Sequence, residues 1–206
     1  MSIAKALVLV THGTEAIETV TTVDLLRRAG LNVTLGAMGL KGRDVVELTS
    51  GVQLTPDQIL DQSHPNPNAS PRGHAPTAEM DRFDAIIMPG GLKGAQAFCA
   101  NRTATSLLKS YYDQGKLVAA ICAAPTIIKA AGIGGPLCLT SYPSLKSEFD
   151  GLYKYCDDKA VVVDGNLITS RGPHTAFQFA LAIIKYLASE EIADNVASQV
   201  LFNTYQ

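Results

Sequence analysis

Leu117-Val-Ala-Ala-Ile-Cys-Ala-Ala-Pro-Thr-Ile-Ile-Lys-Ala-Ala-Gly132 predicts a short buried strand that stops at Cys122 and turns at once into a helix. Residues 117–121 form an apolar run of strand length, Pro125 suits the first turn of a helix, and Gly132 ends that helix. A thiol at this corner faces the amides that open the helix, and those amides favour a thiolate. The corner is then the thiol counterpart of the nucleophile elbow that hydrolases build around serine. The alternative is an inert cysteine that only packs in the core.

The composition favours a single α/β domain that binds a small molecule or another protein. The chain has 206 residues, 47% of them hydrophobic, which is enough for a full core and indicates one domain over residues 1–206. A formal net charge of −2 and the lack of a Lys/Arg run argue against nucleic acid and against an anionic membrane surface as partners. No apolar run reaches the length that spans a membrane.

The cysteines are spread along the chain without a C-x-x-C pair: Cys99, Cys122, Cys138 and Cys156. A chain of this length does not need disulfides, so we expect free thiols in a reducing compartment. Residues 1–13 hold one early lysine and a short apolar run, which is not the layout of a signal peptide. We therefore expect a cytoplasmic protein, with the nucleus left open as a second compartment.

The first part of the chain predicts a strand, a helix and a second strand. Residues 6–10 are continuously apolar, as in a strand covered on both faces of a parallel sheet. Thr14 can cap the helix that follows, and Gly30 stops it before a strand at residues 32–35. Glu18 lies beside the apolar stripe of this helix, where a solvated carboxylate is the simplest interpretation. The predicted buried stripe consists of Ile17, Val20, Val23, Leu25 and Leu26.

Two less regular segments follow. Residues 39–56 combine turn residues with short β-type runs, which predicts a hairpin or a small excursion from the main sheet. Residues 63–78 contain four prolines among Asn, Ser, Gly and His, and predict a long surface loop. His64 and His74 lie in this loop without further ligands at suitable spacing, so we expect no metal site there.

Residues 83–91, Phe-Asp-Ala-Ile-Ile-Met-Pro-Gly-Gly, predict another parallel strand that ends in a Pro-Gly-Gly turn. Because Gly90 and Gly91 lack a Cβ, backbone N–H groups can point outward there, which is how proteins cradle an anion or an oxyanion. A plain tight turn has the same local sequence. Residues 95–114 predict one or two helices that Gly115 stops.

The last part of the chain predicts a strand at residues 137–140, a short helix at 143–149, a hairpin at 159–170 with its turn at Asp164-Gly165, and helices from residue 175 onward. Strands that alternate with helices predict an α/β fold, a three-layer sandwich around a mostly parallel sheet. Chemistry collects at the carboxyl ends of such strands. This rule brings together residues 12–18, 89–91 and 122–124, with residues 171–174 as a further candidate.

The motifs at these places resemble those of the DJ/PfpI superfamily, and the resemblance extends over nearly the whole chain. It implies a flavodoxin-like sandwich with a nucleophile elbow at Cys122, and a homodimer packed through the first helix. The motifs that carry it include Glu18-Thr-Val20, Pro89-Gly-Gly91, Ala119-Ala-Ile-Cys-Ala123, Pro125-Thr126 and Thr169-Ser-Arg-Gly-Pro173.

Position by position, the resemblance implies Cys122 as the nucleophile and Glu18 as the carboxylic acid that hydrogen-bonds its sulfur. It implies the backbone around Gly90, Gly91 and Ala123 as the oxyanion donors. No metal and no other cofactor is implied, and the expected partner is a small dicarbonyl substrate.

The chain departs from the family pattern around the thiol. Tyr142 stands where members have a His, and no Arg occurs near Ser50, where members carry one that reaches a neighbouring subunit. His174, at the start of a helix, can replace the missing base or simply face solvent. Arg28 and Pro173 are further pocket candidates, and residues 63–78 are an insertion relative to shorter members.

The resemblance implies a cysteine-dependent glyoxalase III or protein deglycase that acts on methylglyoxal or its protein adducts and gives lactate. Its thiol can also be oxidised to a sulfinate and report oxidative stress. The competing class is a redox-responsive sensor or chaperone with little or no catalysis, which substrate turnover distinguishes. An intracellular cysteine peptidase is less favoured, because Ala123 rather than a His follows Cys122.

Overall fold

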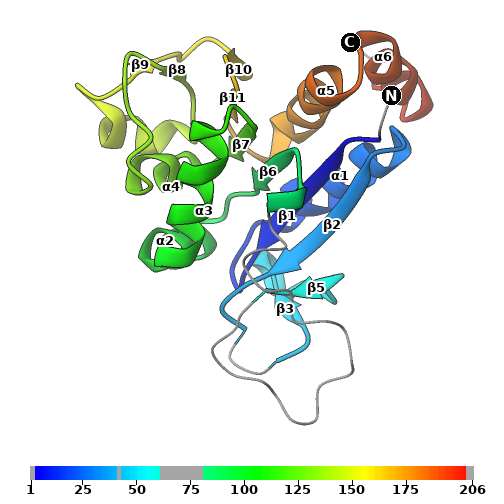
Figure 1. Ribbon diagram of the computed structural model, residues 1–206, viewed down its shortest axis with the longest axis horizontal. Helices are drawn as coiled ribbons and strands as arrows, with labels where there is room; N and C mark the ends of the chain where they lie inside the picture. Colours follow the sequence, from blue (N-terminus) through cyan, green and yellow to red (C-terminus); the bar gives the residue numbers. More distant parts are fainter. Residues whose placement is uncertain (1–2, 41–42, 61–80, 203–206) are drawn as a thin grey trace.

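The computed structural model describes residues 3–40, 43–60 and 81–202 (Figure 1). Within these residues, seven strands form one sheet in the order β10-β11-β7-β6-β1-β2-β5. All neighbouring pairs are parallel except β10 and β11, which form an antiparallel hairpin at one edge. The predicted mostly parallel sheet is confirmed. The predicted loop at residues 63–78 lies outside the described residues.

The strands of the sheet are β1 (Lys5–Val10), β2 (Asn32–Ala37), β5 (Gln58–Ile59), β6 (Ala85–Met88), β7 (Leu117–Ile121), β10 (Val161–Asp164) and β11 (Leu167–Ser170). The central strands β1, β6 and β7 are buried along their whole length except for Lys5. Helices cover both of their faces, which explains why their sequences are continuously apolar rather than alternating.

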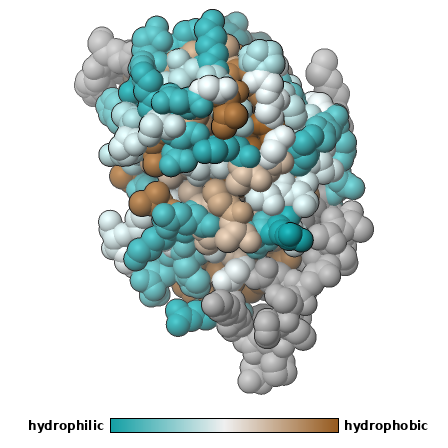
Figure 2. All heavy atoms as spheres, turned by 90° about the vertical axis from the view of Figure 1, so that its left-hand side faces the viewer, coloured by the Kyte–Doolittle hydropathy of each residue, from teal (hydrophilic) through white to brown (hydrophobic). Residues whose placement is uncertain are grey.

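Helices form the two outer layers. On one face α1 (Ala16–Arg28) packs beside α5 (Ala176–Leu187), and α6 (Glu190–Gln199) packs on α5. On the other face lie α2 (Leu92–Ala100), α3 (Arg102–Asp113) and α4 (Pro125–Ala130) (Figure 1). The three-layer sandwich is thereby confirmed. The side formed by α2, α3 and α4 exposes mainly hydrophilic residues, with small apolar patches between them (Figure 2).

Two small sheets lie outside the main one. Strands β3 (Val46–Glu47) and β4 (Gln53–Leu54) pair antiparallel around the short helix η1 (Thr49–Gly51), which confirms the hairpin predicted at residues 39–56. Strands β8 (Cys138–Leu139) and β9 (Lys154–Tyr155) pair with each other across η3 (Pro143–Phe149). The strand predicted at residues 137–140 therefore exists, but it does not join the main sheet.

The turn of the β10–β11 hairpin is Gly165-Asn166, one residue later than predicted. Asp164 still pairs with Leu167 as the last residue of β10, and Gly165 takes the positive φ of +59° that a two-residue hairpin loop needs. Asn166 donates from Nδ2 to the backbone carbonyl of Tyr112 in the last turn of α3 at 3.0 Å and to that of Lys116, just before β7, at 2.8 Å. These bonds fix the position of the turn.

Helix α1 presents a different face to the sheet from the predicted one. Ile17 and Val20 are 55% and 56% exposed, so their assignment to the buried stripe is wrong. The helix is capped by Glu15 rather than Thr14, whose hydroxyl instead accepts from the N–H of Thr11 at 3.0 Å. The buried residues of α1 are Glu18, Thr19, Thr22, Leu25 and Leu26.

Candidate active site

Cys122 directly follows β7 and adopts a φ of +64°, in the left-handed region. For a residue with a Cβ this conformation costs on the order of 1–2 kcal/mol and persists only where the surroundings impose it. Here the Cys122 N–H donates to the carbonyl of Ser170 at 3.0 Å, and its carbonyl accepts from the N–H of Tyr142 at 2.8 Å. With α4 starting at Pro125, the strand, corner and helix lie as predicted.

The Pro-Gly-Gly turn is pressed against this corner so closely that no side chain fits. A Cβ on Gly90 would lie 2.6 Å from the Cβ of Cys122 and 2.7 Å from the carbonyl oxygen of Ile121. Gly91 has a φ of +87°, and a Cβ there would lie 2.4 Å from the carbonyl oxygen of Gly13. The glycines therefore serve a close approach of three backbone segments, at the carboxyl ends of β1, β6 and β7.

Glu18 reaches the same place from the first turn of α1. Its side chain is fully buried, and its Oε2 accepts from the N–H of Gly90 at 2.7 Å. The carbonyl of Gly90 in turn accepts from the N–H of Glu15 at 3.0 Å. The N–H of Gly90, predicted as an oxyanion donor, is thus engaged by Glu18. Gly91 and Ala123 remain as the backbone donors beside the sulfur.

Burial raises the pKa of the Glu18 carboxyl from 4.5 to about 7. The negative charge of Glu15 raises this pKa further, while the hydrogen bond from Gly90 and the Cys122 thiol lower it. Its second oxygen, Oε1, has no hydrogen-bond partner among the described residues. Glu18 is therefore a buried carboxyl that exchanges its proton near neutral pH.

Burial also raises the pKa of the Cys122 thiol, to about 12, and the negative charge of Glu18 adds to this effect. The backbone N–H groups of Gly91 and Ala123 act in the opposite direction, as the sequence predicts, but they are outweighed. A protonated Glu18 removes the repulsion and offers a donor to a thiolate. The state of Glu18 therefore controls the state of the sulfur.

The structure brings Tyr142 to the site and leaves Arg28 away from it. Besides its bond to the Cys122 carbonyl, Tyr142 lies over Gly172, where a Cβ would meet its ring at 3.4 Å. Arg28 sits in the last turn of α1, about 15 Å along the helix from Glu18. There it pairs with Asp24 at 2.8 Å, with both side chains exposed.

The remaining candidates lie on η4 (Pro173–Thr175), next to Gly172. Pro173 is half-buried in its first position. His174 is exposed and forms no hydrogen bond or ion pair with another residue in the described part of the chain. Its position is that of a solvated residue at the start of a helix.

Two residues that shape the site were not singled out from the sequence. Glu15 accepts the N–H of Glu18 at 2.7 Å and so fixes the start of α1, and Ser170 holds the N–H of Cys122. The spacing Glu15-x-x-Glu18 was an available signal, because a polar acceptor three residues before a helical N–H is typical of a cap. Nothing local in the sequence indicates the role of Ser170.

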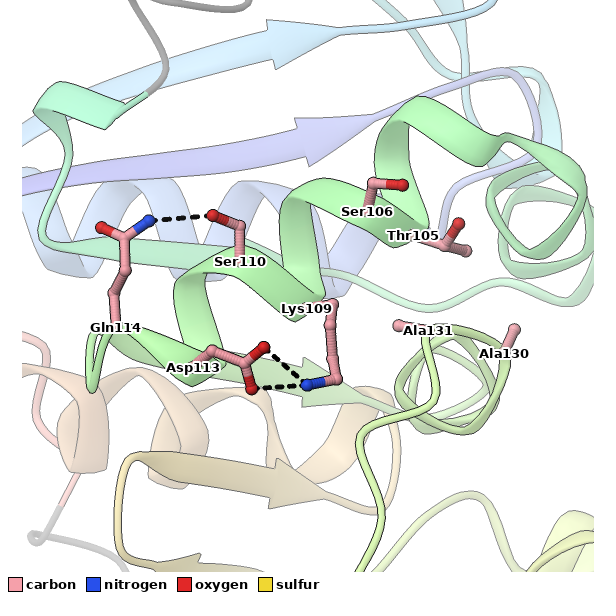
Figure 3. A pocket seen from close by; sticks show the side chains of 8 residues that line it. All are labelled: Thr105, Ser106, Lys109, Ser110, Asp113, Gln114, Ala130 and Ala131. Carbon is pink, nitrogen blue, oxygen red and sulfur yellow. Dashed lines mark hydrogen bonds and ion pairs between the residues drawn. The ribbon is translucent and has the colours of Figure 1, made fainter.

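Hollows also lie away from the thiol in the described part of the chain. One of about 530 Å³ lies between α3 and the end of α4, and four of its side chains pair with one another (Figure 3). Lys109 bonds Asp113 at 2.5 Å, and Gln114 bonds Ser110 at 2.8 Å.

Over the ranges that the structure describes, no group of three or more His, Cys, Asp or Glu could hold a metal ion. None of the helices there is both long and apolar enough to cross a membrane.

A thiol on a strand-to-helix corner, beside a buried carboxyl at the carboxyl edge of a parallel sheet, defines an α/β protein of the cysteine-elbow type. The chain belongs to the DJ-1/PfpI family, whose model matches residues 4–186. The crystal structure of Drosophila melanogaster DJ-1beta superposes with a TM-score of 0.84 at 39% identity, covering 97% of this chain and 98% of that one. Toxoplasma gondii DJ-1, solved in an oxidized form, gives 0.81 at 31% identity and covers 96% and 98%.

Three sequence relatives match over most of their length. Protein dj-1beta of Drosophila melanogaster is 42% identical over 196 residues, which cover 95% of this chain and 96% of that protein. The Parkinson disease protein 7 homolog of Danio rerio is 36% identical and covers 96% of each chain. Glutathione-independent glyoxalase DJR-1.2 of Caenorhabditis elegans is 34% identical over 177 residues, 86% of this chain and 84% of that one.

Proposed function

We propose that this protein is a glutathione-independent glyoxalase that converts methylglyoxal to lactate at Cys122, and that adducts of methylglyoxal on proteins are related substrates. The observation that carries the proposal is the fully buried carboxyl of Glu18, which lies next to the Cys122 thiol and has a pKa of about 7. A carboxyl that takes and returns a proton near neutral pH is what an internal proton shift in a dicarbonyl needs. The name of the Caenorhabditis elegans relative supports this choice of reaction.

In the proposed first step, the sulfur of Cys122 attacks the aldehyde carbon and its proton passes to the Glu18 carboxylate. The N–H groups of Gly91 and Ala123 stabilise the oxyanion, which then takes the proton from Glu18 to give a hemithioacetal. Glu18 next removes the proton on that carbon and delivers it to the neighbouring carbonyl carbon, while the hydroxyl proton of the hemithioacetal passes to the oxygen of that neighbouring carbon, giving a lactyl thioester. Water cleaves the thioester, so one methylglyoxal and one water give one lactic acid and the free thiol.

We expect slow turnover, because Tyr142 stands where the family has a histidine and His174 is exposed to solvent. A tyrosine hydroxyl has no basic nitrogen with which to take up a proton, as the expected histidine would. We therefore propose a slow enzyme in which Cys122 and Glu18 do the chemistry and Tyr142 only shapes the pocket.

Lactate formation from methylglyoxal tests the proposal with wild type and four variants. We expect no lactate from Cys122→Ala, a loss of about 10²-fold or more in Glu18→Gln, and little change in His174→Ala. Tyr142→His should raise the rate. Wild-type lactate no higher than the Cys122→Ala background would contradict the glyoxalase, and a large loss in His174→Ala would place the base at that residue.

A second candidate function, a sensor of oxidation, is favoured by the same geometry. A protonated Glu18 and two backbone N–H groups can all donate to the oxygens of a sulfinate on Cys122. The Toxoplasma gondii relative is described as oxidized, which supports a redox role for the family site without naming the oxidized group. Mild peroxide followed by peptide mass spectrometry should place two oxygens on Cys122 before Cys99, Cys138 or Cys156, and prior oxidation of any of those three would count against the sensor.

A further inference from the structure

The β8–β9 lobe, residues 137–157, touches the catalytic corner through one hydrogen bond. It consists of β8, the η3 helix and β9, packed around the fully buried Phe149. The ring of Tyr155 stacks on that of Phe149 with centroids 6.0 Å apart, and the rings of Tyr153 and Phe149 form a T-shaped pair with centroids 5.8 Å apart. At its inner end the N–H of Tyr142 donates to the Cys122 carbonyl. Movement of residues 141–142 is therefore transmitted to Cys122.

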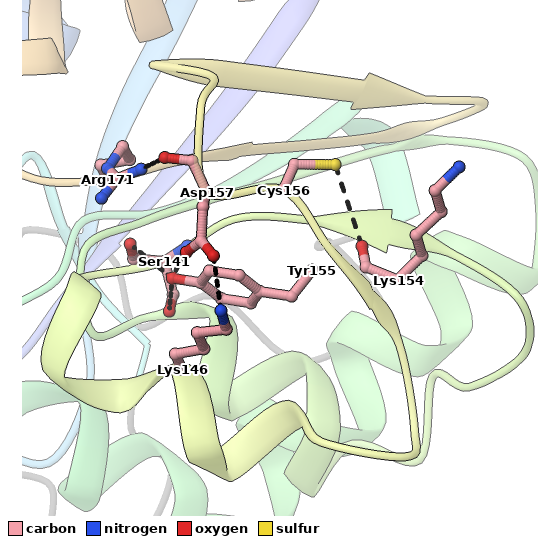
Figure 4. Close-up of polar contacts among 7 residues, drawn as sticks. All are labelled: Ser141, Lys146, Lys154, Tyr155, Cys156, Asp157 and Arg171. Atoms are coloured by element: carbon pink, nitrogen blue, oxygen red, sulfur yellow. Dashed lines mark hydrogen bonds and ion pairs between the residues drawn. The ribbon is translucent and has the colours of Figure 1, made fainter.

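The hydroxyl of Tyr155 lies against Ser141, the residue before Tyr142 (Figure 4). It accepts from the N–H of Ser141 at 3.3 Å, donates to the Ser141 carbonyl at 3.1 Å, and lies 3.1 Å from the Ser141 hydroxyl. The Ser141 hydroxyl also donates to the carbonyl of Tyr142 at 3.2 Å. Ser141 is fully buried, and its N–H has no other hydrogen-bond partner in the described ranges. One phenol thus satisfies most of the polar groups of the residue that precedes Tyr142.

Two charged contacts fix the β9 end of the lobe beside the site. Lys146 of η3 pairs with the carboxylate of Asp157 at 2.5 Å, and Arg171 donates to the Asp157 carbonyl (Figure 4). Arg171 directly precedes Gly172, over which the Tyr142 ring lies. Lys146 and Arg171 thus both contact Asp157, two residues after Tyr155.

We propose that Tyr155 is a positioning residue, which keeps the catalytic sulfur in place by holding the Ser141-Tyr142 backbone against the Cys122 carbonyl. Its effect on turnover rests on the proposed glyoxalase function, whereas its effect on the sulfur does not. Cys122 has a φ of +64°, and its N–H and its carbonyl are both bonded, to Ser170 and Tyr142, which helps to hold this conformation. Without the Tyr155 hydroxyl, the Ser141 N–H loses its partner, the Tyr142 contact loosens, and Cys122 relaxes. The sulfur then moves away from the N–H groups of Gly91 and Ala123, which lower its pKa.

Tyr155→Phe removes one oxygen and keeps the ring that stacks on Phe149. Tyr153→Phe is the matched control, because Tyr153 lies in the same lobe and packs on the same ring. Its hydroxyl donates to the carbonyl of Ile133 at 2.5 Å, and no bond joins it to Ser141. Tyr155→Phe loses the bonds to Ser141 and Tyr153→Phe loses the one bond to Ile133, so both variants should lower the melting temperature, Tyr155→Phe by the larger amount.

The readouts concern Cys122 rather than stability. For Tyr155→Phe we expect alkylation of Cys122 by iodoacetamide to slow about tenfold at fixed pH, and the kcat for lactate to fall about tenfold with KM nearly unchanged. Hydrogen exchange at the Tyr142 amide should become faster. Tyr153→Phe should match wild type in all three.

If Tyr155→Phe and Tyr153→Phe behave alike in alkylation and amide exchange, Tyr155 is only structural and the inference is overturned. If wild type makes no lactate but alkylation and amide exchange still separate the two variants, the proposed function fails while the positioning role stands. The two failures are therefore distinguishable.

Discussion

Glu18 is the residue that most departs from what its environment ordinarily allows. A glutamate on a helix is almost never fully buried unless something compensates its charge, and here the compensation is one hydrogen bond from Gly90. The raised pKa is the consequence, because the protein partly neutralises the group by keeping its proton. A buried carboxyl of this kind lowers the stability of the fold, and its presence is explained by a function in the site.

The cost of Glu18 can be measured as a pH dependence of stability. The folded protein holds this proton up to about pH 7, whereas an unfolded glutamate loses it near 4.5. Between these values the folded state binds more protons than the unfolded state, so the free energy of unfolding falls as pH rises, by about 3 kcal/mol in total. Glu18→Gln should remove this fall and be more stable than wild type at pH 8. Urea unfolding across pH at one protein concentration measures it.

Glu191→Gln is the control, since Glu191 is exposed in the first turn of α6. It should leave the pH dependence as in wild type. Equal slopes for Glu18→Gln and wild type between pH 4.5 and 7 would show that Glu18 does not bind its proton more tightly in the folded protein.

At the scale of the element, the start of α1 connects a helix cap to the chemistry. Glu15 accepts the N–H of Glu18 and also raises the pKa of Glu18 through its charge. Its Oε1 in turn accepts from the hydroxyl of Thr49 at 3.3 Å. Glu15 thus fixes the start of the helix that carries Glu18 and also shifts the pKa of the Glu18 carboxyl.

Glu15→Gln separates these two effects, because the amide oxygen can still cap the helix but carries no charge. We expect the pKa of Glu18 to fall toward its ordinary value, seen as a lower midpoint in the pH dependence of unfolding, with little change in stability at low pH. Asn101→Ala is the comparison, since Asn101 caps α3 with a 3.1 Å bond to Ala104. It should cost about 1 kcal/mol and leave the midpoint unchanged. A midpoint that does not move in Glu15→Gln would remove Glu15 from the control of Glu18.

The sequence predicts the elbow and the glycine turn well because each depends on local chemistry. Strand length, Pro125 and the paired glycines carry the prediction of the corner at Cys122 without knowledge of the tertiary fold. The face of α1 was mispredicted because periodicity assigns Ile17 and Val20 to the core, whereas contact with Gly90 turns Glu18 inward. The contact between Ser170 and Cys122 also cannot be predicted from the local sequence, because it depends on the pairing of β11 with β7.

At the scale of the whole molecule, strand order assembles the site. Strands β1, β6 and β7 are neighbours in the sheet although they are far apart in the chain, so their carboxyl ends bring Gly13, Gly91 and Cys122 together. The parallel pairing of β11 with β7 adds Ser170 on the other side of the corner. A doubly wound sheet therefore provides a place where four loops meet, and the residues on those loops decide the chemistry.

Helix α1 exposes apolar side chains on the surface of the single chain. Ile17 and Val20 stand three residues apart on one helical face, and both are more than half exposed. Side chains at this spacing are neighbours on the helix surface, and such a face suits a second copy of the chain packed through a two-fold axis. The homodimer implied by the family resemblance is thus a proposal that the surface of α1 supports.

Val20→Asp should convert the dimer to a monomer, because a two-fold interface places the new carboxylate in both copies and removes an apolar contact worth about 1.5–3 kcal/mol from each. The fold itself should survive, since Val20 is exposed in the single chain. Val163→Asp is the matched control, because Val163 is also 56% exposed but lies on β10 at the sheet edge. Sedimentation velocity at micromolar protein should give a dimer for wild type and Val163→Asp, and a monomer for Val20→Asp. A wild-type monomer, or a Val20→Asp variant that remains a dimer, would exclude this face of α1 as the interface.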